Sequence, residues 1–176
     1  MNTDNSKIGT TNSDKIHTGS THVTHEFGPI FDEQSQLLIL GSFPSVKSRE
    51  QQFYYGHPQN RFWKLLAALT DEEIPESIEQ KKTLLHTHHI ALWDVIAECD
   101  IVGSSDSSIR NVIPNNLDII IGQAPIRSII ANGTKSYELL IKYNKDRHNI
   151  VKLPSTSPAN AAWNLEKLTE AWRPYF

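Results

Sequence analysis

Three short segments of the sequence hold residue types that suit chemistry on a flat, polar ligand. They are residues 41–63, 132–135 and 154–160. The first carries five of the chain's aromatic residues within residues 53–63, the second an asparagine followed by glycine, and the third three hydroxyl side chains between two prolines. Aromatic rings provide stacking surfaces, amides donate and accept hydrogen bonds, and hydroxyls bind phosphate. Together they suit recognition of a base turned out of a duplex.

The aromatic cluster of the first segment divides into core and surface candidates. Phe62 and Trp63 continue into a helical apolar pattern and are expected in the core. Tyr54 and Tyr55 adjoin Gly56, and each is either a core residue or an exposed ring on which a base stacks. Their position alone leaves both interpretations open.

Asn60 stands directly before that helical pattern and admits two roles. Asparagine is among the preferred N-cap residues, which is the structural interpretation. A side chain at a helix start can also present its amide to a cleft, so the two roles are compatible. His57 is a candidate acid or base, although a histidine held before proline in a turn is more often structural.

The other two segments also have a structural and a functional interpretation. Asn132 offers an amide that could read a base edge, but Asn-Gly is a common turn pair. Ser155, Thr156 and Ser157 could bind phosphate together with backbone N–H groups, or could belong to a merely rigid connection. The functional interpretation gains weight because all three segments are expected at one place in the fold.

Buried strands alternate with amphipathic helices along the chain. Strands are expected over residues 37–41, 90–95, 126–131 and 150–153, and helices over 62–70, 77–89, 116–122, 135–143 and from about 165 to 172. This order predicts a three-layer α/β/α domain around a central, mostly parallel, four-stranded sheet. Ligands of such sheets bind outside the carboxyl ends of the strands, where the three segments fall.

Composition sets the remaining limits. Residues 1–25 are polar and are expected to form a disordered tail before a domain of residues 26–176. Without a long apolar run or a disulfide framework (Cys99 is the single cysteine), we expect a soluble cytoplasmic protein, nucleoid-associated if bacterial, without a membrane partner. The net charge is −3, but residues 121–176 carry 8 Lys/Arg against 4 Asp/Glu. This local excess of positive charge is compatible with a surface that faces phosphate, but it does not by itself identify a nucleic-acid partner.

The histidines do not form a convincing metal site. The candidates fall into two groups, His17, His22 and His25 and then His86, His88 and His89. Neither group has an evident cysteine or carboxylate partner of the kind that zinc prefers. Ser42 and Ser45 accompany His57, but the nucleophile elbow G-x-S-x-G of serine hydrolases is missing. We therefore expect neither a metal nor another cofactor.

Three motifs resemble a known family. Gly41-Ser-Phe-Pro-Ser45, Tyr54-Tyr-Gly-His-Pro-Gln-Asn-Arg-Phe-Trp63 and Leu153-Pro-Ser-Thr-Ser-Pro-Ala-Asn160 are similar to those of the hypoxanthine-DNA (deoxyinosine) glycosylases, a branch of the uracil-DNA glycosylase superfamily. The resemblance covers residues 27–176, with Leu92–Val95 and Ala131–Gly133 in the expected order. It implies the uracil-DNA glycosylase fold and an enzyme of base excision repair.

The resemblance also implies a role for each segment. Tyr55 matches the ring on which the flipped base stacks, Asn132 the amide that reads the base, and residues 154–160 the loop that enters the duplex. Many superfamily members carry Asp or Asn where this chain has Phe43, so the catalytic prediction moves to Asn60. Phe43, Tyr55 and Asn132 are the predicted base contacts. The predicted DNA contacts are Ser45, His57, Ser155, Thr156, Ser157, Pro158 and Asn160.

The expected activity follows from these roles. The chain is predicted to flip a deaminated base, hypoxanthine first, out of double-stranded DNA and to hydrolyse its N-glycosidic bond, leaving an abasic site. It is expected to act as a monomer and without a lyase step. The alternatives are a mismatch-specific uracil or xanthine glycosylase, a non-catalytic DNA-lesion binder, and a metal-dependent hydrolase that would need the histidines.

Overall fold

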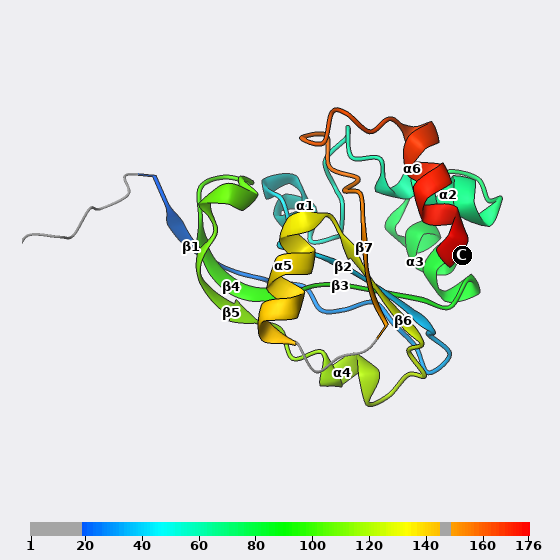
Figure 1. Cartoon of the computed structure of the whole chain (residues 1–176), viewed down its shortest axis with the longest axis horizontal. Helices are drawn as coiled ribbons and strands as arrows, with labels where there is room; N and C mark the ends of the chain where they lie inside the picture. Colours follow the sequence, from blue (N-terminus) through cyan, green and yellow to red (C-terminus); the bar gives the residue numbers. More distant parts are fainter. Residues whose placement is uncertain (1–18, 145–148) are drawn as a thin grey trace, which may run out of the picture.

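A four-stranded parallel sheet lies at the centre of the structure (Figure 1), a computed structural model that describes residues 19–144 and 149–176. Its strand order is β3-β2-β6-β7, and each neighbouring pair is parallel. The strands are β2 (Leu37–Gly41), β3 (Ile90–Asp94), β6 (Ser128–Asn132) and β7 (Ile150–Leu153). These are the four predicted strands, with bounds that differ by one or two residues for β3 and β6.

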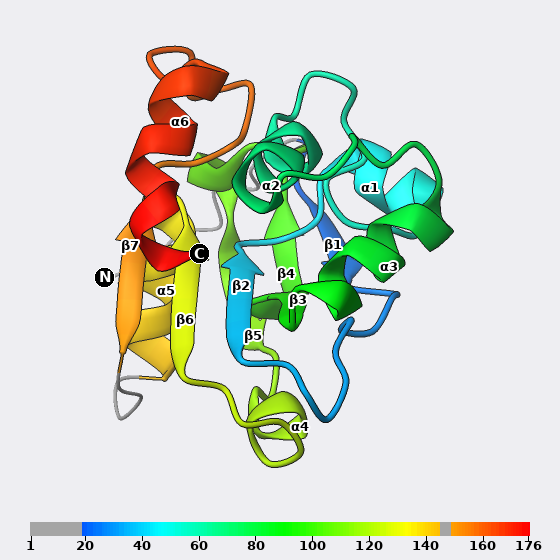
Figure 2. The ribbon, with the colours of Figure 1, turned by 90° about the vertical axis from the view of Figure 1, so that its right-hand side faces the viewer.

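Helices cover both faces of this sheet. Figure 2 shows α2 and α6 in front of the strands, with α3 on the same side, and α5 behind β6 and β7. Their bounds are α2 (Phe62–Thr70), α3 (Ile78–Thr87), α5 (Thr134–Tyr143) and α6 (Leu165–Trp172). The predicted three-layer α/β/α fold is therefore confirmed.

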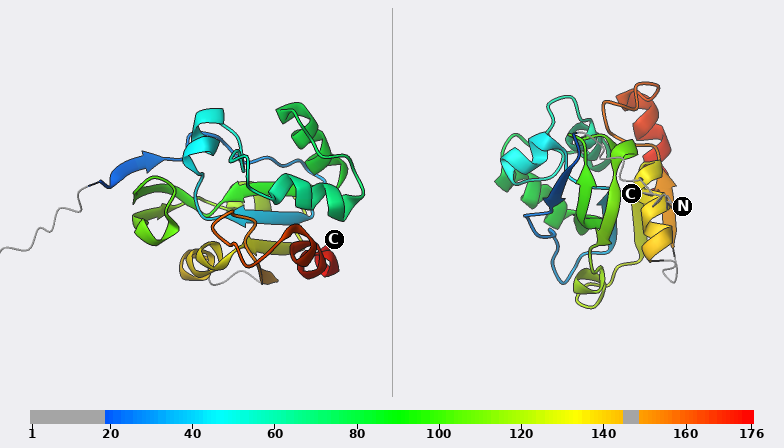
Figure 3. Two further views of the ribbon diagram at one scale, coloured as in Figure 1. Left: turned by 90° about the horizontal axis from the view of Figure 1, so that it is seen from above. Right: turned by 90° about the vertical axis from the view of Figure 1, so that its left-hand side faces the viewer.

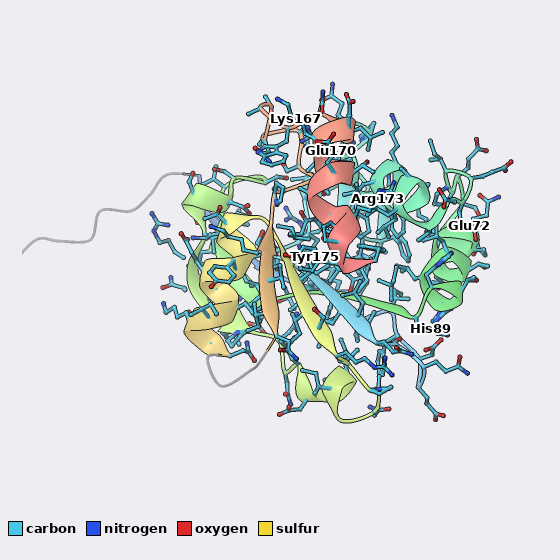
Figure 4. The ribbon with its side chains drawn as sticks, turned by 45° about the vertical axis from the view of Figure 1, so that its right-hand side comes forward. Glu72, His89, Lys167, Glu170, Arg173 and Tyr175 are labelled. Atoms are coloured by element: carbon cyan, nitrogen blue, oxygen red, sulfur yellow. The ribbon has the colours of Figure 1, made fainter. Side chains whose placement is uncertain are left out.

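Apolar patterning explains how the layers form. Leu38, Ile39 and Leu40 have no exposed surface, as expected of a strand covered on both faces. The helices instead bury one side only. In α6, Trp172 is fully buried, whereas Lys167 lies on the outer surface with Glu170 and Arg173 (Figure 4).

A second, antiparallel sheet lies beside the central one (Figure 3, right) and was not predicted. Its order is β1-β4-β5, formed by β1 (Thr21–Thr24), β4 (Ile96–Ile101) and β5 (Arg110–Pro114). These strands carry few regularly spaced apolar residues, so hydrophobic periodicity does not reveal them.

The second sheet corrects the predicted domain boundary. A disordered tail was expected up to residue 25, and that prediction is wrong over residues 21–25. Thr21 pairs with Ile101 and Thr24 with Glu98, and the backbone N–H of His25 donates to Ala97 O at 2.7 Å. Pairing with β4 satisfies the backbone of a segment that has little apolar surface of its own. Residues 1–18 lie outside the described residues.

The remaining elements are short. They are α1 (Val46–Gln51), α4 (Asp118–Ile121) and the 3₁₀ turns η1 (Asp106–Ser108) and η2 (Arg173–Tyr175). Of these only α4 was predicted, within residues 116–122. Among the residues that the structure describes, no helix is both long and apolar enough to cross a membrane.

The register of the central sheet places four strand ends at one edge. Gly41 lies opposite Asp94 across β2 and β3, and Asn132 lies opposite Leu153 across β6 and β7. Parallel strands end on the same side, so the loops after all four strands meet there. The three segments predicted to carry function start from this edge.

Candidate active site

A cavity of about 270 Å³ opens where these loops meet. It is lined by residues from the first and third segments, by Asn132, by Asp94 and by the turn after β4. The complete lining is Gly41–Ser45, Ser48, Tyr54, Tyr55, His57, Asn60, Asp94, Ile101, Ser104, Asp106, Asn132 and residues 155–159. The structure thus brings together nearly all of the predicted site residues; Asn160 lies outside this lining.

Two neighbouring tyrosines have different environments. Tyr54 is 2% exposed, and its hydroxyl donates to Gly28 O at 2.8 Å, so it is a core residue that contributes an edge to the cavity. Tyr55 adopts a left-handed conformation (φ 53°), and its ring stacks on Phe62 with a centroid distance of 3.8 Å. Burial, reinforced by the charge of Asp94, raises the pKa of the Tyr55 hydroxyl far above its usual value. Tyr55 therefore remains a neutral phenol beside the cavity.

Phe43 replaces the polar side chain that many superfamily members have at this position. It is 9% exposed and lines the cavity. The Arg49 guanidinium lies 5.7 Å from its ring centroid, and the His25 ring meets it edge-on at 6.1 Å. An aromatic ring fixed in this way suits a base wall and has no means of polarising water.

Asn60 bonds the start of α2 and borders the cavity, but it lies one residue before the N-cap, which is Arg61 and makes no side-chain cap hydrogen bond. The Asn60 Oδ1 accepts a hydrogen bond from the backbone N–H of Phe62, the first residue of α2, at 3.0 Å. Asn60 also lines the cavity. Its position is therefore compatible both with a structural role at the helix start and with a catalytic role, and the catalytic role stays a prediction.

Asn132 is held by a closed set of hydrogen bonds. Its Oδ1 accepts from Thr156 N at 3.0 Å, while its Nδ2 donates to Thr156 Oγ1 at 3.0 Å and to Tyr55 Oη at 3.1 Å. Both N–H bonds of the amide are thereby used. Reading a base edge with a donor would require one of these bonds to be exchanged. In this structure Asn132 instead joins β6 to the third segment and to Tyr55.

The same bonds give one predicted DNA contact a structural role. Thr156 is buried, and it faces Asn132 with both its hydroxyl and its backbone N–H. A buried hydroxyl with a matched amide partner stabilises the loop. The contact of Thr156 with DNA stays a prediction.

The other predicted DNA contacts divide between two places. Ser45, His57, Ser155, Ser157 and Pro158 line the cavity. Asn160 lines a neighbouring groove together with Lys135, Lys152 and Trp163, and its side chain donates to Ser155 O at 2.9 Å. Asn160 thus organises the loop, and its contact with DNA stays a prediction.

Arg61 was not singled out from the sequence, although it organises the third segment. Its guanidinium donates to the backbone oxygens of Thr156, Ser157, Asn160 and Trp163. Its own backbone N–H also donates to Thr156 O at 3.1 Å. Such a planar, multiply bonded cation fixes the course of a loop that has no regular backbone pairing. The only sequence signal was its place in the string His-Pro-x-Asn-Arg.

Gly133 permits the close approach of β6 to the same loop. Its φ is +100°, and a methyl group built on it would lie 2.8 Å from the Ser155 Cβ. Both the backbone conformation and the lack of space require glycine here. The Asn-Gly pair therefore serves packing as well as turning.

Two acidic residues of the cavity were also missed. Asp94 is 4% exposed, and its Oδ2 accepts a hydrogen bond from His25 Nε2 at 2.8 Å. Asp106 Oδ1 accepts from Ser42 Oγ at 2.8 Å, and burial raises the pKa of the Asp106 carboxyl. Asp94 lay within the motif Leu92–Val95, but its role depends on a histidine distant in sequence.

Four of the described histidines lie beside carboxylates, and His22 contacts two of them, Glu98 and Asp100. His86 Nδ1 and Asp32 Oδ2 lie 2.8 Å apart, and His88 Nε2 and Glu72 Oε1 lie 3.2 Å apart. Within residues 19–144 and 149–176, no three His, Cys, Asp or Glu side chains are grouped as a metal site. His17 lies outside the described residues.

The comparisons with known proteins agree with this fold and site. The family model "Uracil DNA glycosylase superfamily" matches residues 29–174. The chain therefore belongs to the uracil DNA glycosylase superfamily.

Named relatives narrow the resemblance to one branch. A hypoxanthine DNA glycosylase of Methanosarcina acetivorans is 36% identical over 155 residues, which cover 85% of this chain and 96% of that protein. A second hypoxanthine DNA glycosylase, from Methanosarcina barkeri, is 37% identical over 115 residues, covering 64% of this chain and 72% of the relative. A solution NMR structure from M. acetivorans, described as a candidate uracil DNA glycosylase, has a TM-score of 0.70 at 33% identity, covering 84% of this chain and 95% of that one.

Proposed function

We propose that this protein is a DNA glycosylase that excises hypoxanthine from deoxyinosine in double-stranded DNA. The observation that carries the proposal is the cavity at the carboxyl edge of the sheet, which joins Phe43, Tyr55 and Asn60 in one space. Membership of the superfamily and the two relatives named hypoxanthine DNA glycosylase support the same assignment. The acceptor of the glycosyl group is water, and the DNA product is an abasic site.

The proposed reaction breaks the bond between C1′ of the sugar and the base nitrogen. The base leaves with the bonding electrons, the sugar passes through an oxocarbenium-like state, and water adds to C1′. Asn60 has no useful acid–base equilibrium, but its amide can hold the water in line. Its Oδ1 accepts one bond from Phe62 N and keeps a second lone pair for that purpose. Nothing in these steps requires a metal or another cofactor.

Release of the base is easier when hydrogen-bond donors meet its developing negative charge. Ser45 and Ser157 line the cavity, and we propose their hydroxyls as such donors, since the hydrogen bonds from Ser48 N and Ala159 N use only acceptor positions of these hydroxyls. Inosine pairs weakly, so the cost of extruding it is lower than for a normal base, which adds to selectivity. A protein of this size is expected to act as a monomer and to leave the sugar–phosphate backbone intact.

One assay tests the proposal. The protein is incubated with duplex oligonucleotides that carry deoxyinosine, deoxyuridine or deoxyxanthosine, with and without chelator, and abasic sites are then cleaved with alkali. We expect cleavage at deoxyinosine that survives the chelator. Binding without cleavage would identify a lesion-binding protein instead, and faster cleavage at deoxyuridine would identify a uracil enzyme.

A further inference from the structure

A buried His–Asp pair that the proposed mechanism does not use lies at the inner end of the cavity, where β2 and β3 end; Asp94 lines the cavity and His25 packs behind it. His25 and Asp94 have side-chain exposures of 1% and 5%, and their closest atoms, Nε2 and Oδ2, lie 2.8 Å apart. His25 directly follows β1 and lies outside residues 29–174, which the family model matches. The second sheet thus brings a residue from outside the family's common region into the site.

The surroundings of His25 define its hydrogen-bonding state. Its ring is enclosed by Phe27, Phe43 and Tyr54, with centroid distances of 4.4, 6.1 and 5.9 Å. Its Nδ1 is buried without a hydrogen-bond partner among the described residues. A proton on Nδ1 would therefore be a buried, unsatisfied donor, which is costly. The favoured form carries its proton on Nε2 and donates it to Asp94 Oδ2.

Asp94 consequently has one oxygen fixed and one available. No hydrogen bond from the described residues reaches its Oδ1. A methyl group on Gly41 would lie 2.2 Å from this Oδ1, so glycine at this strand end keeps the oxygen accessible. Asp94 lines the cavity, and the Oδ1 of the Asn132 amide already accepts a hydrogen bond from Thr156 N. The Oδ1 of Asp94 is therefore the acceptor that this end of the cavity offers to a base.

The position of Asp94 Oδ1 at the inner end of the cavity determines which edge of a bound base it contacts. A flipped nucleotide stays attached to the duplex through its sugar, so the sugar remains near the mouth and the far edge of the base reaches the inner end. Hypoxanthine, uracil and xanthine carry a ring N–H on that edge. Adenine and cytosine, the amino bases from which hypoxanthine and uracil arise, have a ring nitrogen lone pair there, which a carboxylate oxygen repels.

We propose that the His25–Asp94 pair is a specificity-determining element of the base pocket. His25 is the positioning residue that fixes the carboxylate, and Asp94 Oδ1 accepts the ring N–H of a deaminated base. The inference rests on the proposed function and identifies the substrate class of that site as bases with a ring N–H. Guanine shares this N–H, so its rejection depends on other features, such as its stable pairing in the duplex.

The test combines variants with a substrate that lacks the ring N–H. Single-turnover excision is measured for wild type, Asp94→Asn, His25→Ala and His25→Gln on duplexes with deoxyinosine or deoxynebularine, whose purine base has no proton on N1. Asp94→Asn should slow deoxyinosine excision about 10- to 100-fold, the usual effect of losing a hydrogen bond to a charged group. The rate on deoxynebularine should not fall and is expected to rise, because the carboxylate that repels its N1 lone pair is replaced by an amide that can donate to N1.

His25 provides the positioning test. His25→Ala should reproduce most of the deoxyinosine defect, and His25→Gln, whose amide can still donate to Asp94, should recover at least part of it. His25→Ala leaves the carboxylate in place, so it answers the question even if Asp94→Asn fails to fold. His22→Ala is the matched control, because His22 on β1 also pairs with an aspartate, Asp100 on β4, at 2.9 Å, but with 57% of its side chain exposed. It should leave both rates unchanged.

Each other outcome has a defined meaning. Equal losses on deoxyinosine and deoxynebularine would overturn base reading and assign Asp94 to the bond-breaking step or to stability, which thermal melts distinguish. An unchanged deoxyinosine rate in Asp94→Asn would overturn the proposal while leaving the glycosylase function intact. A wild-type protein that excises no base would instead overturn the proposed function itself.

Discussion

At the scale of the residue, the side chains that line the cavity also make hydrogen bonds that stabilise the fold. Asn60 accepts a hydrogen bond from Phe62 N at the start of α2, and the Asn132 amide bonds Tyr55 and Thr156 with both N–H bonds and its oxygen. Their geometry is therefore fixed before any ligand arrives. Preorganised groups of this kind are effective in catalysis because they need not reorient during the reaction.

Asn60 allows the structural and catalytic contributions to be separated. Asn60→Ala should lower the single-turnover rate on deoxyinosine about 10²- to 10³-fold, because the water loses its positioning group. It should also lower the free energy of unfolding by about 1 kcal/mol, because the hydrogen bond to Phe62 N is lost. Rates come from alkali-cleaved oligonucleotides and stability from urea denaturation.

Asn60→Ser is the control for this hydrogen bond. Serine can still accept from a backbone N–H, so stability should be largely restored while the rate stays low. If Asn60→Ala lost stability but kept its rate, the role of Asn60 would be structural alone.

At the scale of the element, the conformation of the loop between β7 and α6 is stabilised by residues of other segments. Arg61 donates to four of its backbone oxygens, and Gly133 gives Ser155 room to approach β6. Neither residue belongs to the loop. Its conformation thus depends on the start of α2 and on the turn before α5.

Arg61→Ala should loosen this loop. Removing a cation bonded to several buried carbonyls is expected to cost about 2–4 kcal/mol of stability, and affinity for lesion-containing duplex should fall by about tenfold or more. Limited proteolysis should show new cleavage within residues 154–163. Arg173→Ala, which loses a bond of 3.4 Å to Ala68 O on an exposed surface, is the matched control and should show none of these effects.

Gly133→Ala tests the close approach. Gly103 has a positive φ of +58°, but a methyl group added to it would have no atom within 4 Å, whereas the methyl at Gly133 would meet Ser155 at 2.8 Å. Gly103→Ala should cost about 1 kcal/mol for backbone strain alone. Gly133→Ala should cost about 2 kcal/mol or more, because its backbone (φ 100°, ψ 168°) suits only glycine and its methyl would meet Ser155. Equal losses in urea denaturation would show that neither feature of Gly133 adds to the cost.

The helices and strands differ in how far their positions can be predicted from the sequence. β2, α2 and β7 carry continuous or helically spaced apolar residues, so local periodicity predicts them. β1 has no such pattern and exists through pairing with β4. Tertiary pairing overrides weak local preference, which is why the boundary at residue 25 was misplaced.

The site was predictable to a similar extent. Loops after buried strands identified Tyr55, Asn60 and Asn132 as cavity neighbours. The burial of Thr156 and the role of Asp94 depend on partners 24 and 69 residues away in sequence, which no local pattern encodes. Arg61 was missed for the same reason, because its partners lie 95 to 102 residues further along the chain.

At the scale of the whole molecule, charge is unevenly distributed. The net charge of −3 does not favour a polyanion, yet the groove beside the cavity holds Lys135 and Lys152. This groove shares Ser155 and Ser157 with the cavity. Its position fits the backbone of a strand whose nucleotide enters the cavity.

Salt dependence tests this arrangement. For the wild type, the logarithm of the binding constant for duplex DNA should fall linearly with the logarithm of salt concentration. Lys135→Ala and Lys152→Ala should each reduce that slope by about one, because each removes one phosphate contact. Lys82→Ala, on the exposed side of α3, should leave the slope unchanged. An unchanged slope in both groove variants would place the DNA backbone elsewhere.

The second sheet has a consequence for the order in which the pocket forms. β1 pairs with β4, and His25 meets Asp94 only after 69 further residues have been added to the chain. The third segment, at residues 154–160, leaves the ribosome later still. A nascent chain therefore has no complete pocket before residue 160 has been added. Excision activity should accordingly be missing from chains whose synthesis stops before that residue.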